Sequence, residues 1–182
     1  MSGHGAHVAL LRGINVGGKN RLPMNDLAAM FRDAGAQEVR TYIQSGNVVF
    51  RADAARIVRL GTAIAKAMQA DLGWSVPIVI RSAAELGAAA KGNPFLKEGI
   101  ATAALHVGFL LERPDRSRVA ALDPDRSPPD RYVVRGGEIF LHLPNGVART
   151  KLTSQYLDSR LGTVVTVRNW NTVTTLLEMT RA

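Results

Sequence analysis

Short apolar runs of strand length alternate in this chain with longer segments whose apolar residues recur at helical spacing. In the first half, runs that predict strands lie at residues 7–11, 39–43, 48–50 and 76–80. A helix is predicted to open at Pro23, because a proline suits the first helical turn, with Leu27 and Phe31 on its apolar face. A longer helix is predicted over residues 54–72, ended by Gly73. The predicted element order is therefore β-α-β-β-α-β.

The same order returns in the second half, after a short helix predicted to start at Ser82. Runs that predict strands lie at residues 105–111, 132–134, 139–143 and 164–167. Helices are predicted over residues 114–122 and 153–161, and a final helix follows around Val173. The two halves are offset by roughly 90 residues, which indicates an internal repeat of supersecondary units.

Each half has the element order of the ferredoxin-like, or split β-α-β, unit, in which two helices cover one face of an antiparallel sheet. The sequence therefore predicts an α+β fold made by tandem duplication of this unit, with one linking and one C-terminal helix. The first subdomain, with the linking helix, is predicted over residues 1–91, and the second over residues 92–182. In this arrangement Leu10 corresponds to Val107. The alternative is a single α+β domain in which the second order is a coincidence.

Composition excludes several classes of protein. The 182 residues include no cysteine, which excludes disulfides and thiolate metal sites. No apolar run approaches the roughly 20 residues of a membrane span. Residues 1–6 lack the basic and apolar regions of a signal peptide. A cytoplasmic location without a membrane partner is therefore expected.

The chain is basic, with a formal net charge of +8 from 23 basic and 15 acidic residues. The excess is spread over both halves and does not form a tail. A polyanionic partner such as nucleic acid is one explanation. Coding bias is the other, because 18 of the 23 basic residues are arginine in a chain rich in alanine and glycine.

A glycine-rich basic loop follows the first predicted strand. Its glycines permit positive φ angles and a close approach of the backbone to a ligand, and its cations and amides suit an anion. The candidate ligand-binding residues are Arg12, Asn15, Gly17, Gly18, Lys19 and Asn20. The segment from Gly13 to Lys19 matches the start of the P-loop pattern, but Asn20 replaces the Ser or Thr that holds Mg²⁺. Two interpretations remain, a looser anion-binding nest and a turn that only reverses the chain.

Polar residues gather at two further turns. Arg168, Asn169, Trp170 and Asn171 lead from a predicted strand into the last helix. An N-cap explains one asparagine, whereas the four residues together can bind a planar or anionic group; packing of the tryptophan between subdomains is the alternative. Ser45 and Asn47 lie between two predicted strands and are further candidates, with a hairpin turn as the alternative. The glycine-rich loop and residues 168–171 are expected to converge.

The chain holds little that is typical of a catalytic centre. Its histidines are His4 and His7 near the N-terminus and His106 and His142 within predicted strands of the second half. No carboxylate accompanies them at metal-ligand spacing, and the carboxylates are scattered singly. Neither a metal site nor a cofactor is predicted. Catalysis by this chain would rest on Arg, Lys, Asn and Ser.

Four segments together resemble a known bacterial family. They read LLRGINVGGKN from Leu10, TYIQSGNVVF from Thr41, NPF from Asn93 and RNWNTV from Arg168. In these motifs, which span nearly the whole chain, the sequence is similar to the bacterial domain-of-unknown-function family 1697. The resemblance implies two tandem ferredoxin-like subdomains. It implies no reaction, substrate or catalytic residue.

Two classes of function follow from these observations. The first is a binding module for an anionic ligand, either nucleic acid or a nucleotide, that uses the loop at residues 12–20. The alternative is an enzyme that acts on a phosphorylated or carboxylated small molecule in a cleft between the subdomains. Steep salt dependence of binding to unrelated nucleic acids favours the first class. Saturable stabilisation by one metabolite, with little salt effect, favours the second.

Overall fold

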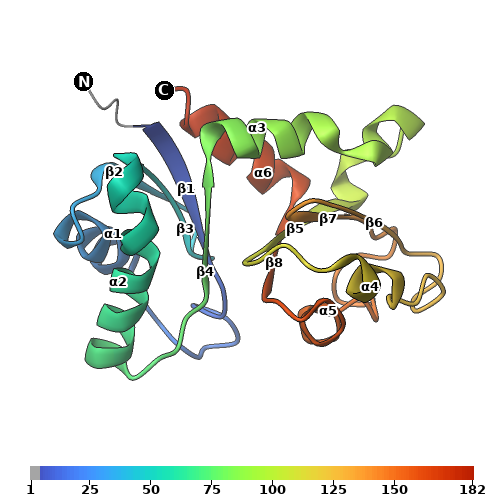
Figure 1. The fold of residues 1–182 in the computed structure, drawn as a ribbon, viewed down its shortest axis with the longest axis horizontal. Coiled ribbons are helices and arrows are strands. Elements are labelled where there is room, and N and C mark those ends of the chain that lie inside the picture. The colour runs from blue at the N-terminus through green and yellow to red at the C-terminus, as the bar shows by residue number, and fades with distance from the viewer. Residues whose placement is uncertain (1–4) are drawn as a thin grey trace. The chain divides into compact units, whose positions relative to one another are not determined.

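The computed structural model describes residues 5–182, which divide into two compact units (Figure 1). Unit 1 comprises residues 5–87 together with Leu176–Ala182, and unit 2 comprises Ala88–Thr175. Each unit combines helices with an antiparallel sheet, which confirms the α+β class. The subdomain boundary expected between residues 91 and 92 stays a prediction. His4 lies outside the described residues.

Unit 1 contains a four-stranded sheet and two helices that cover it. Its elements are β1 (Gly5–Leu11), α1 (Met24–Asp33), β2 (Gln37–Tyr42), β3 (Asn47–Ala52), α2 (Ala54–Leu72) and β4 (Ile78–Ser82). The strands lie in the order β2-β3-β1-β4, and every neighbouring pair is antiparallel. A further helix, α3 (Ala83–Gly92), follows β4 directly.

Unit 2 repeats this arrangement after two short 3₁₀ helices, η1 (Pro94–Glu98) and η2 (Thr102–Ala104). Its elements are β5 (Leu105–Leu110), α4 (Arg116–Ala120), β6 (Arg131–Arg135), β7 (Glu138–His142), α5 (Ser154–Leu161) and β8 (Val165–Asn169). The strand order is β6-β7-β5-β8, again with antiparallel neighbours. The helix α6 (Trp170–Met179) follows β8 as α3 follows β4.

Alternation along each strand directs one set of apolar side chains toward the helices. In unit 1, Leu11 and Phe50 of the sheet pack with Phe31 of α1 and Ile64 of α2 in one buried cluster, and Figure 1 shows both helices on the same side of the sheet. An equivalent cluster forms in unit 2 around Leu157 of α5. The apolar residues that predict strands and helices are therefore the core residues of each unit.

Local sequence signals explain where α2 and β4 begin and end. The carboxylate of Asp53 accepts the backbone N–H of Arg56 at 2.8 Å and caps the start of α2. Gly73, at a φ of 72°, ends the same helix in the left-handed conformation. β4 begins at Ile78, two residues later than its apolar run predicts. The reason is that Pro77 has no N–H to donate to a neighbouring strand.

The two sheets share one hydrogen-bond register. The N–H of Leu11 donates to Gly46 O at 2.8 Å, and the N–H of Leu110 donates to Gly137 O at 2.9 Å, so Leu11 corresponds to Leu110. By the same alignment Leu10 corresponds to Phe109. The expected correspondence of Leu10 with Val107 is wrong by two residues. A pattern of apolar positions cannot detect such a shift, because a slip of two residues keeps every side chain on the same face.

The units differ in two connections at the edge of the first sheet where β1 ends. In unit 1, residues 12–23 join β1 to α1, and residues 43–46 join β2 to β3. The corresponding connections of unit 2 are shorter, at residues 111–115 and 136–137. Loops built on a rigid framework are where binding residues concentrate. The longer connections are therefore the part of unit 1 that its repeat lacks.

Substitution of Gly46 tests how tightly these two connections pack against each other. A Cβ at this position would lie 2.8 Å from Ile14 Cδ1 and 2.9 Å from Leu11 Cβ, at a φ of +77°. We expect Gly46→Ala to lower the free energy of unfolding by about 2–5 kcal/mol, because the strain of a positive φ adds to the overlap in the core. Urea unfolding measures this change.

Gly73→Ala is the matched control for that substitution. Gly73 has a similar φ of +72°, but a Cβ there would meet nothing within 4 Å. We expect a loss of about 1–2 kcal/mol from the backbone strain alone. Equal losses for the two variants would show that contact between Gly46 and Ile14 contributes nothing.

Candidate functional site

The glycine-rich loop is a small closed hairpin. Val16 and Lys19 form an antiparallel bridge in which the N–H of Lys19 donates to Val16 O at 3.0 Å. Between them, Gly17 and Gly18 adopt φ angles of 57° and 76°, which glycine reaches without strain. The two glycines thus form the turn of the hairpin, and the loop backbone is held in one conformation.

Two asparagines hold this hairpin in place. The Asn15 amide donates to Leu22 O at 2.9 Å and to Gln44 O at 2.8 Å, and its Oδ1 accepts the N–H of Leu22 at 2.8 Å. The Asn20 amide donates to Gly13 O at 2.9 Å. Both asparagines have positive φ angles, 54° and 49°, which this residue type tolerates. The polar atoms of Asn15 are therefore occupied within the chain.

The turn between β2 and β3 is braced by the residue that follows it. Asn47 is fully buried, and its amide donates to Tyr42 O at 3.1 Å and to Ser45 Oγ at 2.9 Å. Ile43 has a φ of 48°, an unusual angle for a β-branched residue, and is 51% exposed. The turn therefore holds an apolar side chain in solvent at a cost in backbone strain.

The hydrogen bond from Asn15 to Gln44 joins the hairpin to this turn. We call the joined residues 12–23 and 43–46 the two-loop platform. The first connection leaves β1 and the second enters β3, which pairs with β1, so the bond fixes their relative position at one end of the sheet of unit 1.

The two-loop platform carries three cations, Arg12, Lys19 and Arg21, and its sequence contains no carboxylate. Lys19 and Arg21 are exposed, and neither has an ion-pair partner among residues 5–182. Arg12 is half-buried. Val16 is 63% exposed, so the same surface presents apolar as well as positive groups.

The second polar cluster lies at the junction of β8 and α6, in unit 2. The Oδ1 of Asn169 accepts the N–H of Thr172 at 2.8 Å, which makes Asn169 the N-cap of α6. Arg168 donates to Val167 O at 3.0 Å, and burial lowers the pKa of its guanidinium to about 10. Its convergence with the glycine-rich loop stays a prediction, because the two segments belong to different units.

A pocket of about 620 Å³ lies within unit 2, lined by Thr102, Ala103, His106, Asn169, Trp170, Asn171 and Thr174. His106 and Asn169 are direct partners in the pairing of β5 with β8, so their side chains leave the same face of the sheet. His106 is 8% exposed, and its Nδ1 is buried without a well-formed hydrogen bond. Burial lowers the pKa of His106, and the backbone of Ala104 acts in the opposite direction.

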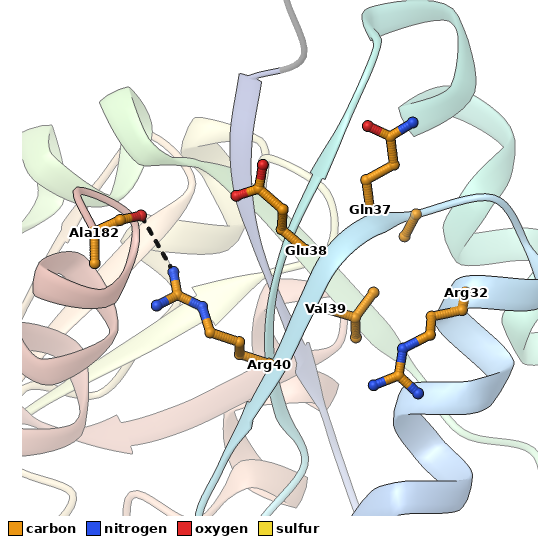
Figure 2. Close-up of a pocket in the computed structure, with 7 residues that line it drawn as sticks. Arg32, Gln37, Glu38, Val39, Arg40 and Ala182 are labelled. Atoms are coloured by element: carbon orange, nitrogen blue, oxygen red, sulfur yellow. Dashed lines mark hydrogen bonds between the residues drawn. The ribbon is translucent and has the colours of Figure 1, made fainter.

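A second hollow, of about 830 Å³, lies along the outer edge of β2 (Figure 2). Two of its charged groups, Arg40 and Glu38, already have partners within unit 1. Figure 2 shows the guanidinium of Arg40 directed at Ala182, whose carbonyl oxygen is 3.5 Å away, and the same group donates to Met179 O at 2.5 Å. Glu38 accepts from Arg51 at 2.8 Å. These contacts tie the last residues to β2, and they make this hollow a weaker ligand site than the pocket of unit 2.

The family model described as a protein of unknown function, DUF1697, matches residues 5–140. The chain belongs to this family. The resemblance inferred from the sequence motifs is thereby confirmed. A conserved bacterial protein from Streptococcus pneumoniae has a similar solved structure, at 20% identity and a TM-score of 0.75, over 99% of this chain and 100% of that chain. At this identity the likeness shows a common fold. No curated protein matches the chain.

Membership of DUF1697 assigns no reaction, so the site has to be argued from its own geometry. Among residues 5–182, no helix is long and apolar enough to cross a membrane. The same residues contain no group of three or more His, Asp or Glu side chains arranged to hold a metal ion.

Several residues of these sites are missing from the candidates that the sequence predicts, and Arg21 and His106 are the two charged or titratable ones. Arg21 follows the glycine-rich loop directly. It could have been found in the sequence as the third cation before the first helix. The only feature that points to His106 is its correspondence with His7 in the first repeat. His7 pairs with Ser82 in the first sheet as His106 pairs with Asn169 in the second. That correspondence emerges only once the register of both sheets is known.

Asn15 tests whether the asparagines support the loop or bind a ligand. We expect Asn15→Ala to lower the free energy of unfolding by about 2–4 kcal/mol, because three hydrogen bonds are lost at roughly 0.5–1.5 kcal/mol each. Lys19→Ala should change it by less than about 0.5 kcal/mol, since Lys19 is exposed. Urea unfolding compares the two variants. Equal stability of both would mean that the Asn15 amide does not hold the hairpin.

His106 predicts a pH dependence of stability. Its pKa in the folded chain lies below the ordinary value of 6.5, so between these two values the unfolded chain binds more protons. The stabilisation is complete above about pH 7 and falls as the pH drops through the folded-state pKa. His106→Asn removes this contribution, whereas His142, whose pKa burial also lowers, is present in both proteins. Thermal unfolding between about pH 5 and 8 should therefore give converging curves at low pH; parallel curves would contradict the shift.

Proposed function

We propose that this DUF1697 protein is a binding module for a phosphate-bearing ligand, nucleic acid or nucleotide, and that the two-loop platform is its contact surface. One observation carries the proposal. Lys19 and Arg21 are exposed without an ion-pair partner among residues 5–182, on a segment whose sequence has no carboxylate. Positive groups that are not neutralised within the chain are available to phosphate oxygens.

The conformation of the platform supports binding on entropic grounds. The hairpin is closed by the Val16–Lys19 bridge and held by Asn15, so little conformational freedom is lost when a ligand settles on it. Gly17 and Gly18 have no side chains that would keep a ligand from the backbone. In this proposal Lys19, Arg21 and Arg12 contact the ligand.

The remaining candidates of the platform position these contacts. Asn15 and Asn20 hold the hairpin, and Asn47 holds the adjacent turn through Ser45. Their side chains are bonded to groups of the chain itself. Substituting them is therefore expected to act on affinity through the shape of the platform.

The apolar groups of the platform favour nucleic acid over a simple anion. Val16 and Ile43 of the platform are 63% and 51% exposed, and Val16 pairs with Lys19 in the hairpin. A single strand presents unstacked bases as well as phosphates, and such a ligand covers apolar and positive surface together. Inorganic phosphate would use only the cations.

We also propose that both units have the ferredoxin-like fold and derive from one duplicated unit. The shared strand order and register support this. Arg81 and Arg168 occupy the same register position, and each donates to the carbonyl of the preceding residue, at 3.1 and 3.0 Å. The boundary between residues 91 and 92 and the cytoplasmic location expected from the sequence belong to the same proposal.

Binding to single-stranded RNA tests the platform. A labelled RNA of about 20 nucleotides is titrated by fluorescence anisotropy over a range of salt concentrations. We expect the double variant Lys19→Ala, Arg21→Ala to bind more weakly for every RNA sequence. The slope of the logarithm of affinity against the logarithm of salt concentration should fall by about one for each cation removed.

The double variant Arg59→Ala, Lys66→Ala is the charge-matched control. Both residues are exposed on α2 of unit 1, outside the two connections that form the platform. A reduced slope in the platform variant alone supports the proposal, whereas equal reductions in both would show that net charge accounts for binding. Titration with ATP separates the two ligands, because binding of a nucleotide at a closed site saturates and stabilises the fold with little dependence on salt.

A further inference from the structure

The pocket of unit 2 belongs to a different unit from the two-loop platform and differs from it in chemistry. We propose that it binds an uncharged planar heteroaromatic molecule with hydrogen-bond donors and acceptors on its edge, the chemistry of a nucleobase. Its volume of about 620 Å³ lies in the range of small-ligand pockets. Its polar walls are Thr102, His106, Asn169, Asn171 and Thr174, with the indole of Trp170 beside them.

His106 is the feature that distinguishes this pocket from an ordinary surface hollow. It is 8% exposed, its Nδ1 is buried without a well-formed hydrogen bond, and it lines the pocket. The backbone of Ala104 acts on the buried side of the ring, so the nitrogen left for a ligand in the pocket is Nε2. A buried imidazole whose second nitrogen has no partner in the chain is suited to pair with a ligand.

The charge of the lining indicates a neutral ligand. His106 is the only ionisable side chain among the residues that line the pocket. Burial lowers its pKa below 6.5, so the imidazole is neutral near pH 7. The lining therefore has neither a cation for a phosphate nor a carboxylate for an amine.

The hydrogen-bonding groups of the lining match the edge of a base. Asn169 accepts the N–H of Thr172 through Oδ1, which leaves its amide hydrogens for a ligand. Asn171 is exposed, and its amide offers a donor beside an acceptor, the pattern that asparagine uses to read a base edge. The hydroxyl of Thr174 donates to Trp170 O at 3.2 Å or Asn171 O at 3.0 Å, so its lone pairs accept.

The equivalent position of unit 1 has a different neighbour. His7 occupies the same register position as His106, and its Nδ1 lies 2.8 Å from Gly5 O, two residues earlier, as Ala104 lies two residues before His106. Its ring also stacks on Phe50, with centroids 5.8 Å apart. Leu141 stands opposite His106 where Phe50 stands opposite His7. The change from an aromatic to an aliphatic partner removes the stacking neighbour of the imidazole.

Fluorescence of Trp170 provides a direct test. The chain has two tryptophans, so Trp74→Phe leaves Trp170 as the reporter in the full-length protein. Adenine, guanosine, cytosine and uracil are titrated separately. We expect a saturable change with at least one of them, unaffected by inorganic phosphate.

Ala103→Trp places a bulky side chain in the lining of the pocket and should abolish binding, which saturation-transfer NMR of the base measures. Ala101→Trp is the matched control, because Ala101 is also exposed and does not line the pocket. Asn171→Ala should weaken binding about three- to tenfold, the effect of one or two neutral hydrogen bonds. His106→Ala should abolish it, and His7→Ala should leave it intact.

Each outcome decides for or against the proposal. Saturable binding that is lost in Ala103→Trp and retained in Ala101→Trp supports it. Absence of binding by all four probes at millimolar concentration overturns it, as does competition by inorganic phosphate. If His106→Ala fails to fold, Asn171→Ala and Ala103→Trp decide alone, and binding at wild-type strength in both contradicts the assignment.

Discussion

The central strand of each sheet is hydrogen-bonded along both of its edges, and the rest of the structure depends on that constraint. β1 lies between β3 and β4, and β5 lies between β7 and β8. Their backbone groups are satisfied inside the sheet, so a central strand cannot slip without breaking two ladders at once. The points where chains leave the sheet are thereby fixed. Asn15 reaches Gln44, and His106 stands beside Asn169, because these ladders hold their strands in one register.

The elements of the fold were predictable because their signals are local. The period of the apolar residues, the cap at Asp53 and the stop at Gly73 act within a few residues, and α2 matches its predicted bounds. The site was predictable only in part. The sequence shows that Asn15 is polar, but it does not show that the amide donates to the carbonyl oxygens of Leu22 and Gln44. Gln44 lies on a different connection. Such partners depend on the register of the strands, which an apolar pattern leaves undefined by two residues.

Comparison of the two units shows which features both share and which features only one of them has. Both keep the strand order and the two helices that bury one face of the antiparallel sheet, and both have a further helix after the fourth strand. The additions differ. Unit 1 extends two connections, whereas unit 2 keeps them short and replaces Phe50 by Leu141 beside the equivalent histidine. Each change lies at the end of a strand, where it leaves the ladders intact, so the two units can vary there without loss of the common core.

Net charge alone overstates how much of this chain is available to an anion. Several arginines are used inside unit 1: Arg51 pairs with Glu38 at 2.8 Å, Arg56 donates to Gly35 O at 2.6 Å, and Arg40 donates to Met179 O. A guanidinium has five donors and can bond carbonyl oxygens in many directions, so an arginine-rich composition can serve the fold directly. Lys19 stands apart from these residues, because it projects from a two-glycine turn whose own backbone is already paired. The local arrangement of the charged side chains therefore says more about anion binding than the formal net charge of +8. The cations available to an anionic ligand are those whose charged groups are not bonded within the fold.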